Sequence, residues 1–194
     1  MADAVGLDLY WVPLGAGTRV VPVCGRLYES LVARREGRSP QPLFHAALVA
    51  GRADGVRVTV EVAPEAGGPV GHRASAVAGG AVGSRLLGRS RLFRYEVRRW
   101  PGGVIPDLQY AVGGANLLTD DPRCVDAVLA ALDRVPAPVW GRDELRTGDM
   151  WNSNSVVSWA LAINGLAGAA PVPPNGGRAP GWQAGLVAAA RSAG

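Results

Sequence analysis

The sequence has no lysine, only two cysteines and only two histidines. Cys24 and Cys124 lie far apart and outside any CxxC or CxxH spacing. We therefore expect packed thiols, and neither a disulfide framework nor a zinc site. His45 and His72 are too few for a histidine-rich metal centre. The composition thus predicts a protein that uses no metal and no cofactor.

Long apolar runs are also missing, since none approaches the roughly 18 residues that a membrane-spanning helix needs. Residues 1–5 lack the basic and apolar stretches of a signal peptide. We therefore expect a cytoplasmic protein without a membrane partner.

The 20 residues that carry a positive charge are all arginines, and the net charge is +4 with histidine taken as neutral. A nucleic-acid surface needs basic residues gathered on one face with aromatic residues between them. The densest arginine clusters, within residues 34–38 and 94–99, are modest and are typical of a solvated face. An arginine-rich nucleic-acid binder is therefore the last of our hypotheses, and we expect no nucleic-acid partner.

What is present indicates one folded domain. The chain has 194 residues, enough for a single hydrophobic core. Apolar residues make up 48% and charged residues 19%, which is the profile of a globular protein. The 27 glycines and 15 prolines exceed average usage, so loops and turns must take a large share of the fold. No repeat or linker divides residues 1–194, and the oligomeric state is not predicted.

Local patterns predict an α+β fold in which an antiparallel sheet packs against a few helices. We expect loops rich in glycine and proline at residues 63–83 and 171–181. Strands are expected at residues 7–14, 19–23, 43–49, 56–62 and 92–100. Helices are expected at residues 26–35, 122–135 and 153–163.

The clearest local signal is a β-hairpin over residues 43–62, with Asp54-Gly55 in its turn. Alternation places His45 on one face of the first strand. On the second strand, Glu61 lies on the face opposite the valines. His45 and Glu61 are therefore polar candidates on neighbouring strands.

A polar segment opens the last predicted helix, and Asn152 is a credible N-cap that puts Ser153 in the first turn. Unpaired amides and the helix dipole at such a position favour negative charge and can hold an oxyanion. A serine hydroxyl needs a general base, and His45 is a candidate that Glu61 could orient. The alternatives stay open: Ser153 as a capping hydroxyl, Glu61 as an exposed carboxylate, and Ser155 as the nucleophile.

A histidine strand, a polar residue on the next strand and Asn-Cys at the head of a late helix form the circularly permuted papain-like arrangement. That arrangement is found in relatives of the NlpC/P60 and lecithin-retinol acyltransferase families. Residues 152–156, Asn-Ser-Asn-Ser-Val, resemble their Asn-Cys-Asn-x-Phe motif with serine in place of cysteine. The chain is still more similar to uncharacterised bacterial families that carry Pro-Asn-Ser-Asn-Thr-Phe before a helix, with an upstream histidine strand matched by residues 43–48.

The resemblance implies Ser153 as nucleophile, His45 as base and Glu61 as the orienting residue. It implies a hydrolase or acyl-transfer enzyme acting on an amide or ester carbonyl of a small-molecule or peptide substrate. Neighbouring candidates for substrate binding are Asn152, Asn154, Ser155, Trp151 and Arg178.

Three alternatives remain at this stage. In the first, the chain is a non-catalytic descendant of that fold that binds a small molecule or a partner protein in the former active-site cleft, because serine is far less nucleophilic than cysteine near neutral pH. In the second, Arg178 binds no substrate and holds its loop in place as a structural clasp anchored by Trp182. In the third, Asp149 caps the helix or pairs with Arg142 or Arg146.

Overall fold

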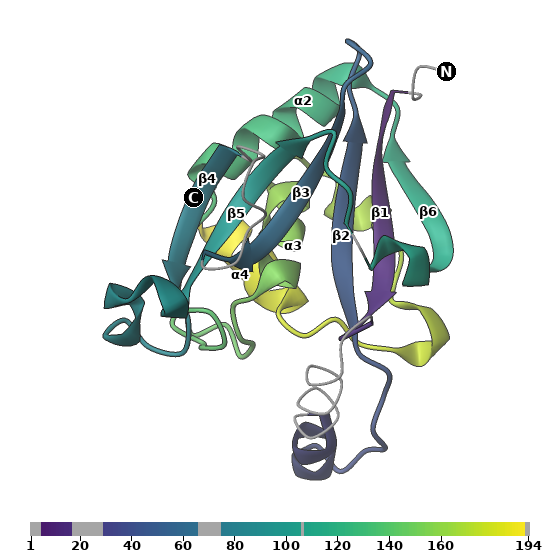
Figure 1. Cartoon of the computed structure of the whole chain (residues 1–194). Coiled ribbons are helices and arrows are strands. Elements are labelled where there is room, and N and C mark those ends of the chain that lie inside the picture. The colour runs from purple at the N-terminus through teal and green to yellow at the C-terminus, as the bar shows by residue number, and fades with distance from the viewer. Residues whose placement is uncertain (1–4, 17–28, 66–74, 106, 193–194) are drawn as a thin grey trace.

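Six antiparallel strands form one sheet in the order β4-β5-β3-β2-β1-β6 (Figure 1). The structure is a computed structural model that describes residues 5–16, 29–65, 75–105 and 107–192. The strand bounds are β1 Gly6–Pro13, β2 Phe44–Gly51, β3 Arg57–Pro64, β4 Ser75–Ala81, β5 Arg94–Pro101 and β6 Val112–Thr119.

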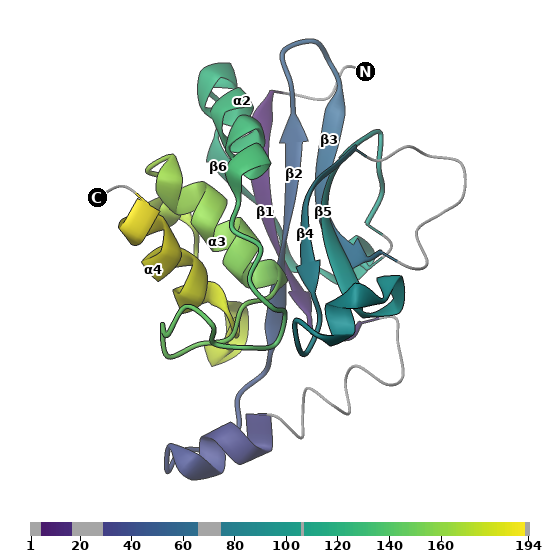
Figure 2. The same ribbon diagram turned by 90° about the vertical axis from the view of Figure 1, so that its left-hand side faces the viewer.

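Three helices cover one face of this sheet: α2 (Pro122–Ala131), α3 (Ser153–Ile163) and α4 (Trp182–Ser192) (Figure 2). Short 3-10 turns occur at η1 Leu87–Arg89, η2 Arg91–Phe93, η3 Leu108–Tyr110, η4 Leu132–Arg134, η5 Ala167–Ala169 and η6 Pro174–Gly176. Residues 29–35 are also helical and lie beyond the end of the sheet where β2 begins (Figure 1). The architecture is the predicted α+β domain. Within the part of the chain that the structure describes, no helix is both long and apolar enough to cross a membrane.

The main core lies between the sheet and the helices. Strand β2 contributes Phe44, Ala46 and Leu48, which pack in one cluster with side chains of α2, α3 and α4. Since successive strand residues point to opposite faces, His45 projects from the other side of the sheet. That second face is covered in part by the β5–β6 connection, to which Thr59 Oγ1 donates a hydrogen bond at the Gly103 carbonyl, 2.8 Å away.

Most of the predicted elements are confirmed. The hairpin pairs β2 with β3 as expected, and the predicted strands at 7–14 and 92–100 correspond to β1 and β5. The predicted helices at 122–135 and 153–163 correspond to α2 with η4 and to α3. The predicted strand at 19–23, part of the helix at 26–35, Cys24 and His72 lie outside the described residues.

Three elements were not predicted. β4 falls in the expected surface loop, β6 contains Gly113-Gly114, and α4 follows the expected tail loop. The glycines and alanines of β4 and the two glycines of β6 carry weak local preference for strand, so pairing of β4 with β5 and of β6 with β1 decides these two conformations. Cys124 is half-buried in the first turn of α2, rather than packed in the core as predicted.

Helices α3 and α4 pack closely because Gly185 has no side chain. A Cβ at Gly185 would lie 2.1 Å from Ser158 Oγ and 2.2 Å from the Ser155 carbonyl oxygen. We expect Gly185→Ala to lower the free energy of unfolding by about 3 kcal/mol, measured by urea denaturation. Gly168→Ala is the control, since a Cβ there meets nothing within 4 Å. Equal stability of the two variants would contradict this packing.

Candidate functional site

The head of α3 is closed by a capping box. Asn152 Oδ1 accepts a hydrogen bond from the Asn154 amide at 2.9 Å, and Ser155 Oγ accepts one from the Asn152 amide at 3.0 Å. Ser155 Oγ also donates to the Gly181 carbonyl at 2.7 Å, and the residue is fully buried. Ser155 is therefore a structural hydroxyl, and its position argues against its use as the nucleophile.

Asn154 joins the helix head to strand β2. Its Oδ1 accepts a hydrogen bond from the Ala46 amide at 2.7 Å, and its Nδ2 donates to the Phe44 carbonyl at 3.1 Å. Strand β3 pairs with β2 only from Leu48 onward, so Asn154 occupies the edge of β2 that β3 leaves open. The helix head is thus fixed to both chain neighbours of His45.

Ser153 is the first residue of α3 and is half-buried. The cap and the first helical bonds engage the amides of Asn154, Ser155 and Val156. Among the described residues, these bonds leave the amide of Ser153 as a first-turn donor for a developing oxyanion. The capping hydroxyl of this turn belongs to Ser155. The alternative in which Ser153 serves as the capping hydroxyl is therefore wrong.

His45 pairs with an aspartate that the sequence did not indicate. His45 Nε2 lies 2.9 Å from Asp107 Oδ2, and this hydrogen bond is the main cause that lowers the pKa of the Asp107 carboxyl. Asp107 comes from the β5–β6 connection, 62 residues further along the chain. No motif marks Asp107 in the sequence, because only the fold carries that connection across the sheet to His45.

Glu61 is therefore not the orienting partner that the sequence predicted. It lies on β3, and one of its carboxylate oxygens is buried with no hydrogen-bond partner among the described residues. Strand β3 diverges from β2 before the level of His45, since their pairing begins at Leu48. The divergence separates the two strands where the predicted contact would have formed.

Ser153 and His45 belong to different layers of the molecule. The His45 side chain lies on the face opposite α3, and within the described residues no hydrogen bond joins it to Ser153. The side-chain amide of Asn154, at the edge of β2 that β3 leaves unpaired, links the backbone next to His45 to the helix head that carries Ser153. Any reaction between Ser153 and His45 must pass around this edge rather than across the face of the sheet.

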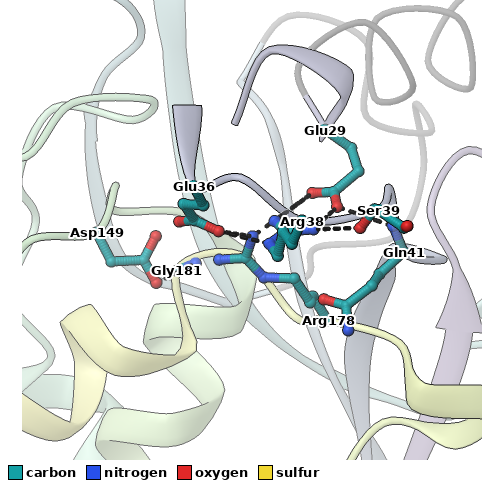
Figure 3. A network of polar contacts seen from close by, with 8 residues as sticks. All are labelled: Glu29, Glu36, Arg38, Ser39, Gln41, Asp149, Arg178 and Gly181. Atoms are coloured by element: carbon teal, nitrogen blue, oxygen red, sulfur yellow. Dashed lines mark hydrogen bonds and ion pairs between the residues drawn. The ribbon is translucent and has the colours of Figure 1, made fainter. Parts of the chain in front are cut away.

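Arg178 and Asp149 hold the loop that precedes α4 (Figure 3). Arg178 Nη1 lies 3.2 Å from a Glu36 oxygen and 3.6 Å from a Glu29 oxygen. Asp149 Oδ2 accepts a hydrogen bond from the Gly181 amide at 2.7 Å, and burial raises the pKa of this carboxyl. Arg178 therefore ties its loop to the segment that carries Glu29 and Glu36, in line with the alternative in which it holds the loop in place. Asp149 binds this loop, and among the described residues it pairs with neither Arg142 nor Arg146.

The remaining candidates for substrate binding are mostly structural. Trp151 is only 1% exposed and belongs to the core. Asn154 is 3% exposed, and the side chain of Asn152 is engaged at both ends, by the Asn154 amide and by the Pro180 carbonyl. These side chains build the site and do not face a substrate.

A separate cavity of about 320 Å³ opens beside the loop that precedes α4. Its lining includes Trp11 and Trp182, whose rings lie 5.2 Å apart at 52°, together with Asp149, Arg178 and Gln183. The volume is at the lower end of what small-molecule sites occupy. Neither Ser153 nor His45 lines this cavity. Among the described residues, no group of three His, Cys, Asp or Glu side chains is arranged to hold a metal ion.

Comparison with known proteins gives no relative for this chain. No protein-family model matches it, and neither a curated protein nor a solved structure does. The resemblance to the permuted papain-like arrangement therefore stays a prediction, supported by residues of this chain alone.

Proposed function

We propose that this protein is a hydrolase or acyl-transfer enzyme in which Ser153 attacks an amide or ester carbonyl. In this proposal His45 is the general base and Asp107, in place of Glu61, orients the imidazole. The observation that carries it is the Asn154 side chain, which bonds the residues on both sides of His45 and so holds the helix head at that strand.

The roles follow from which atoms are engaged. His45 Nε2 lies 2.9 Å from Asp107 Oδ2. In the proposed mechanism Nε2–H donates a hydrogen bond to this carboxylate, which leaves Nδ1 to take the proton of the Ser153 hydroxyl. The Ser153 amide, at the positive end of α3, donates to the oxyanion as it forms. The protonated imidazole then passes its proton to the leaving amine or alcohol. Water, or a second hydroxyl or amine, next attacks the acyl-serine and completes hydrolysis or transfer.

One local movement is needed for this chemistry. The imidazole must turn from the face of the sheet toward the edge of β2 where Asn154 meets Phe44 and Ala46, and the β5–β6 connection must carry Asp107 with it so that the bond to Nε2 is kept. Hydrogen bonds of catalytic groups are often long in free enzymes and tighten when substrate binds.

The test is covalent labelling with a fluorophosphonate, which reacts with activated serines. We expect labelling of the wild-type protein and complete loss of the label in Ser153→Ala, followed by intact-protein mass spectrometry. Ser39→Ala, an exposed serine far along the chain from α3, is the control and should label normally. An unlabelled wild type, or a labelled Ser153→Ala variant, would refute the assignment.

A second function is favoured by the cavity whose lining includes Trp11 and Trp182. There the protein would bind a small molecule without transforming it, in a site separate from Ser153. The two functions separate in one comparison: a binding protein stays unlabelled by the fluorophosphonate and loses small-molecule binding in Trp182→Ala but not in Ser153→Ala.

A further inference from the structure

Apolar side chains are concentrated on the connection between β4 and β5. Of the ten large apolar side chains that are exposed among the described residues, four fall within residues 86–93. Leu86 is 70% exposed, Leu87 45%, Leu92 74% and Phe93 42%. Isolated exposed apolar residues are ordinary, but a group this dense marks an interaction surface. We call residues 84–94 the 84–94 lobe.

The 84–94 lobe is a built structure that holds these side chains outward. Its two turns, η1 and η2, are joined by Ser90, whose hydroxyl caps η2. Gly88 is buried against Ala81, and a Cβ at that position would lie 2.3 Å from the Ala81 methyl group. The Arg94 side chain donates to the Gly88 carbonyl at 3.3 Å. The exposure of the four apolar residues therefore follows from fixed local packing.

The same lobe carries positive charge. It contains no acidic residue and has four arginines: Arg85, Arg89, Arg91 and Arg94. Two glutamates from outside the lobe offset part of this charge, since Glu144 pairs with Arg85, and Glu65 pairs with Arg91 and Arg94. Two positive charges remain in excess, and Arg89 is exposed with no acidic partner among the described residues.

The position of the lobe also matters. It leaves the sheet between Ala81 and Arg94, which pair at one end of β4 and β5. At the next level of β5, Tyr95 pairs with Pro64 at the end of β3, and this is the end at which the antiparallel β2 begins. The lobe therefore projects from the same end of the sheet as Phe44 and the helix head (Figure 1).

We propose that the 84–94 lobe docks the protein on an anionic lipid surface. Leucine and phenylalanine side chains gain free energy by entering the boundary between headgroups and acyl chains, while arginines contact the phosphates. Nucleic acid would use the arginines but give the four apolar side chains nothing to enter. The sequence predicted no membrane partner because it lacks a spanning segment; surface docking needs none. This proposal is independent of catalysis by Ser153.

The test is co-sedimentation of the full chain with vesicles made of equal parts of phosphatidylcholine and phosphatidylserine. We expect the wild-type protein to bind, and binding to pure phosphatidylcholine to be weaker. Replacing Leu86, Leu87, Leu92 and Phe93 together by serine should lower the partition coefficient by about tenfold or more. Arg89→Gln should lower it by about fivefold, with a difference that shrinks as salt is added.

The matched control replaces two exposed apolar residues elsewhere, Leu117→Ser and Val172→Ser, and should bind as the wild type does. Thermal unfolding followed by circular dichroism checks that each variant is folded. The proposal is overturned if the wild type ignores anionic vesicles, or if the lobe variant binds them equally well. It is also overturned if the four substitutions only dissolve a self-association seen by sedimentation velocity, because the lobe is then a contact between copies.

Discussion

Asp107→Ala is expected to reduce turnover of an activated ester by about 10²- to 10⁴-fold while leaving the protein folded. The reason is geometric. The Asp107 carboxylate is the group that fixes the His45 ring, at 2.9 Å from Nε2, and without it the imidazole has no preferred orientation or tautomer. Steady-state kinetics should show the loss in kcat, with KM changed little, because Asp107 orients the base and does not touch the substrate.

Two variants complete this prediction. Asp107→Asn keeps the shape of the side chain but not its charge, so it cannot stabilise the imidazolium that forms on His45 and should lose activity much as Asp107→Ala does. Glu61→Gln should leave turnover unchanged, since Glu61 is not the partner of His45. A large loss in Glu61→Gln combined with a normal Asp107→Ala variant would reverse the assignment of the orienting residue.

The same pair makes stability depend on pH. The pKa of Asp107 is lowered from its ordinary value of 3.8 by the hydrogen bond to His45, so the folded state favours the ionised carboxylate. Its contribution to stability is therefore present above the ordinary pKa and is lost as the pH falls through the lowered value. The difference in unfolding free energy between the wild type and Asp107→Asn should accordingly vanish at acidic pH.

Asn154→Ala is expected to lower the free energy of unfolding by about 3–5 kcal/mol. Asn154 is 3% exposed. Its side-chain amide forms hydrogen bonds with three backbone groups from two segments: the Ala46 amide and the carbonyls of Phe44 and Pro180. Alanine would remove the side-chain partner of the Ala46 amide and of the Phe44 carbonyl, while the Pro180 carbonyl keeps its bond from Asn152. A buried unsatisfied backbone group costs far more than a lost surface contact. Urea denaturation measures the change.

The control for Asn154 is Asn164→Ala. Asn164 lies at the other end of α3 and makes a single recorded side-chain bond, to the Ala160 carbonyl at 2.8 Å. We expect that variant to lose about 1 kcal/mol or less. Asn154→Ala should also lose fluorophosphonate labelling under conditions where it is still folded, because the helix head is no longer tied to the His45 strand. Labelling that survives would separate the link from the proposed chemistry.

The sequence predicted where helix α3 begins better than it predicted what the polar side chains of its first turn do. The N-cap at Asn152 and the start of α3 at Ser153 follow from the order of short polar residues, and the structure confirms them. Asn154 and Ser155 were interpreted as substrate-binding groups, yet both are buried and engaged by backbone. A polar side chain has the same appearance in a sequence whether it faces solvent or satisfies a buried backbone group.

What the sequence alone determined is local: the β2–β3 hairpin from its Asp-Gly turn, strand β1, and the capped heads of α2 and α3. Each depends on contacts within a few residues, where side-chain preference and hydrogen-bonding capacity act directly. Only the tertiary structure decided that β4 pairs with β5 and β6 with β1. It also decided that Asp107, and not Glu61, contacts His45, and that the Asn154 side chain links the head of α3 to β2. These contacts join residues far apart in the chain, and their free energy comes from burying groups together after the sheet has formed.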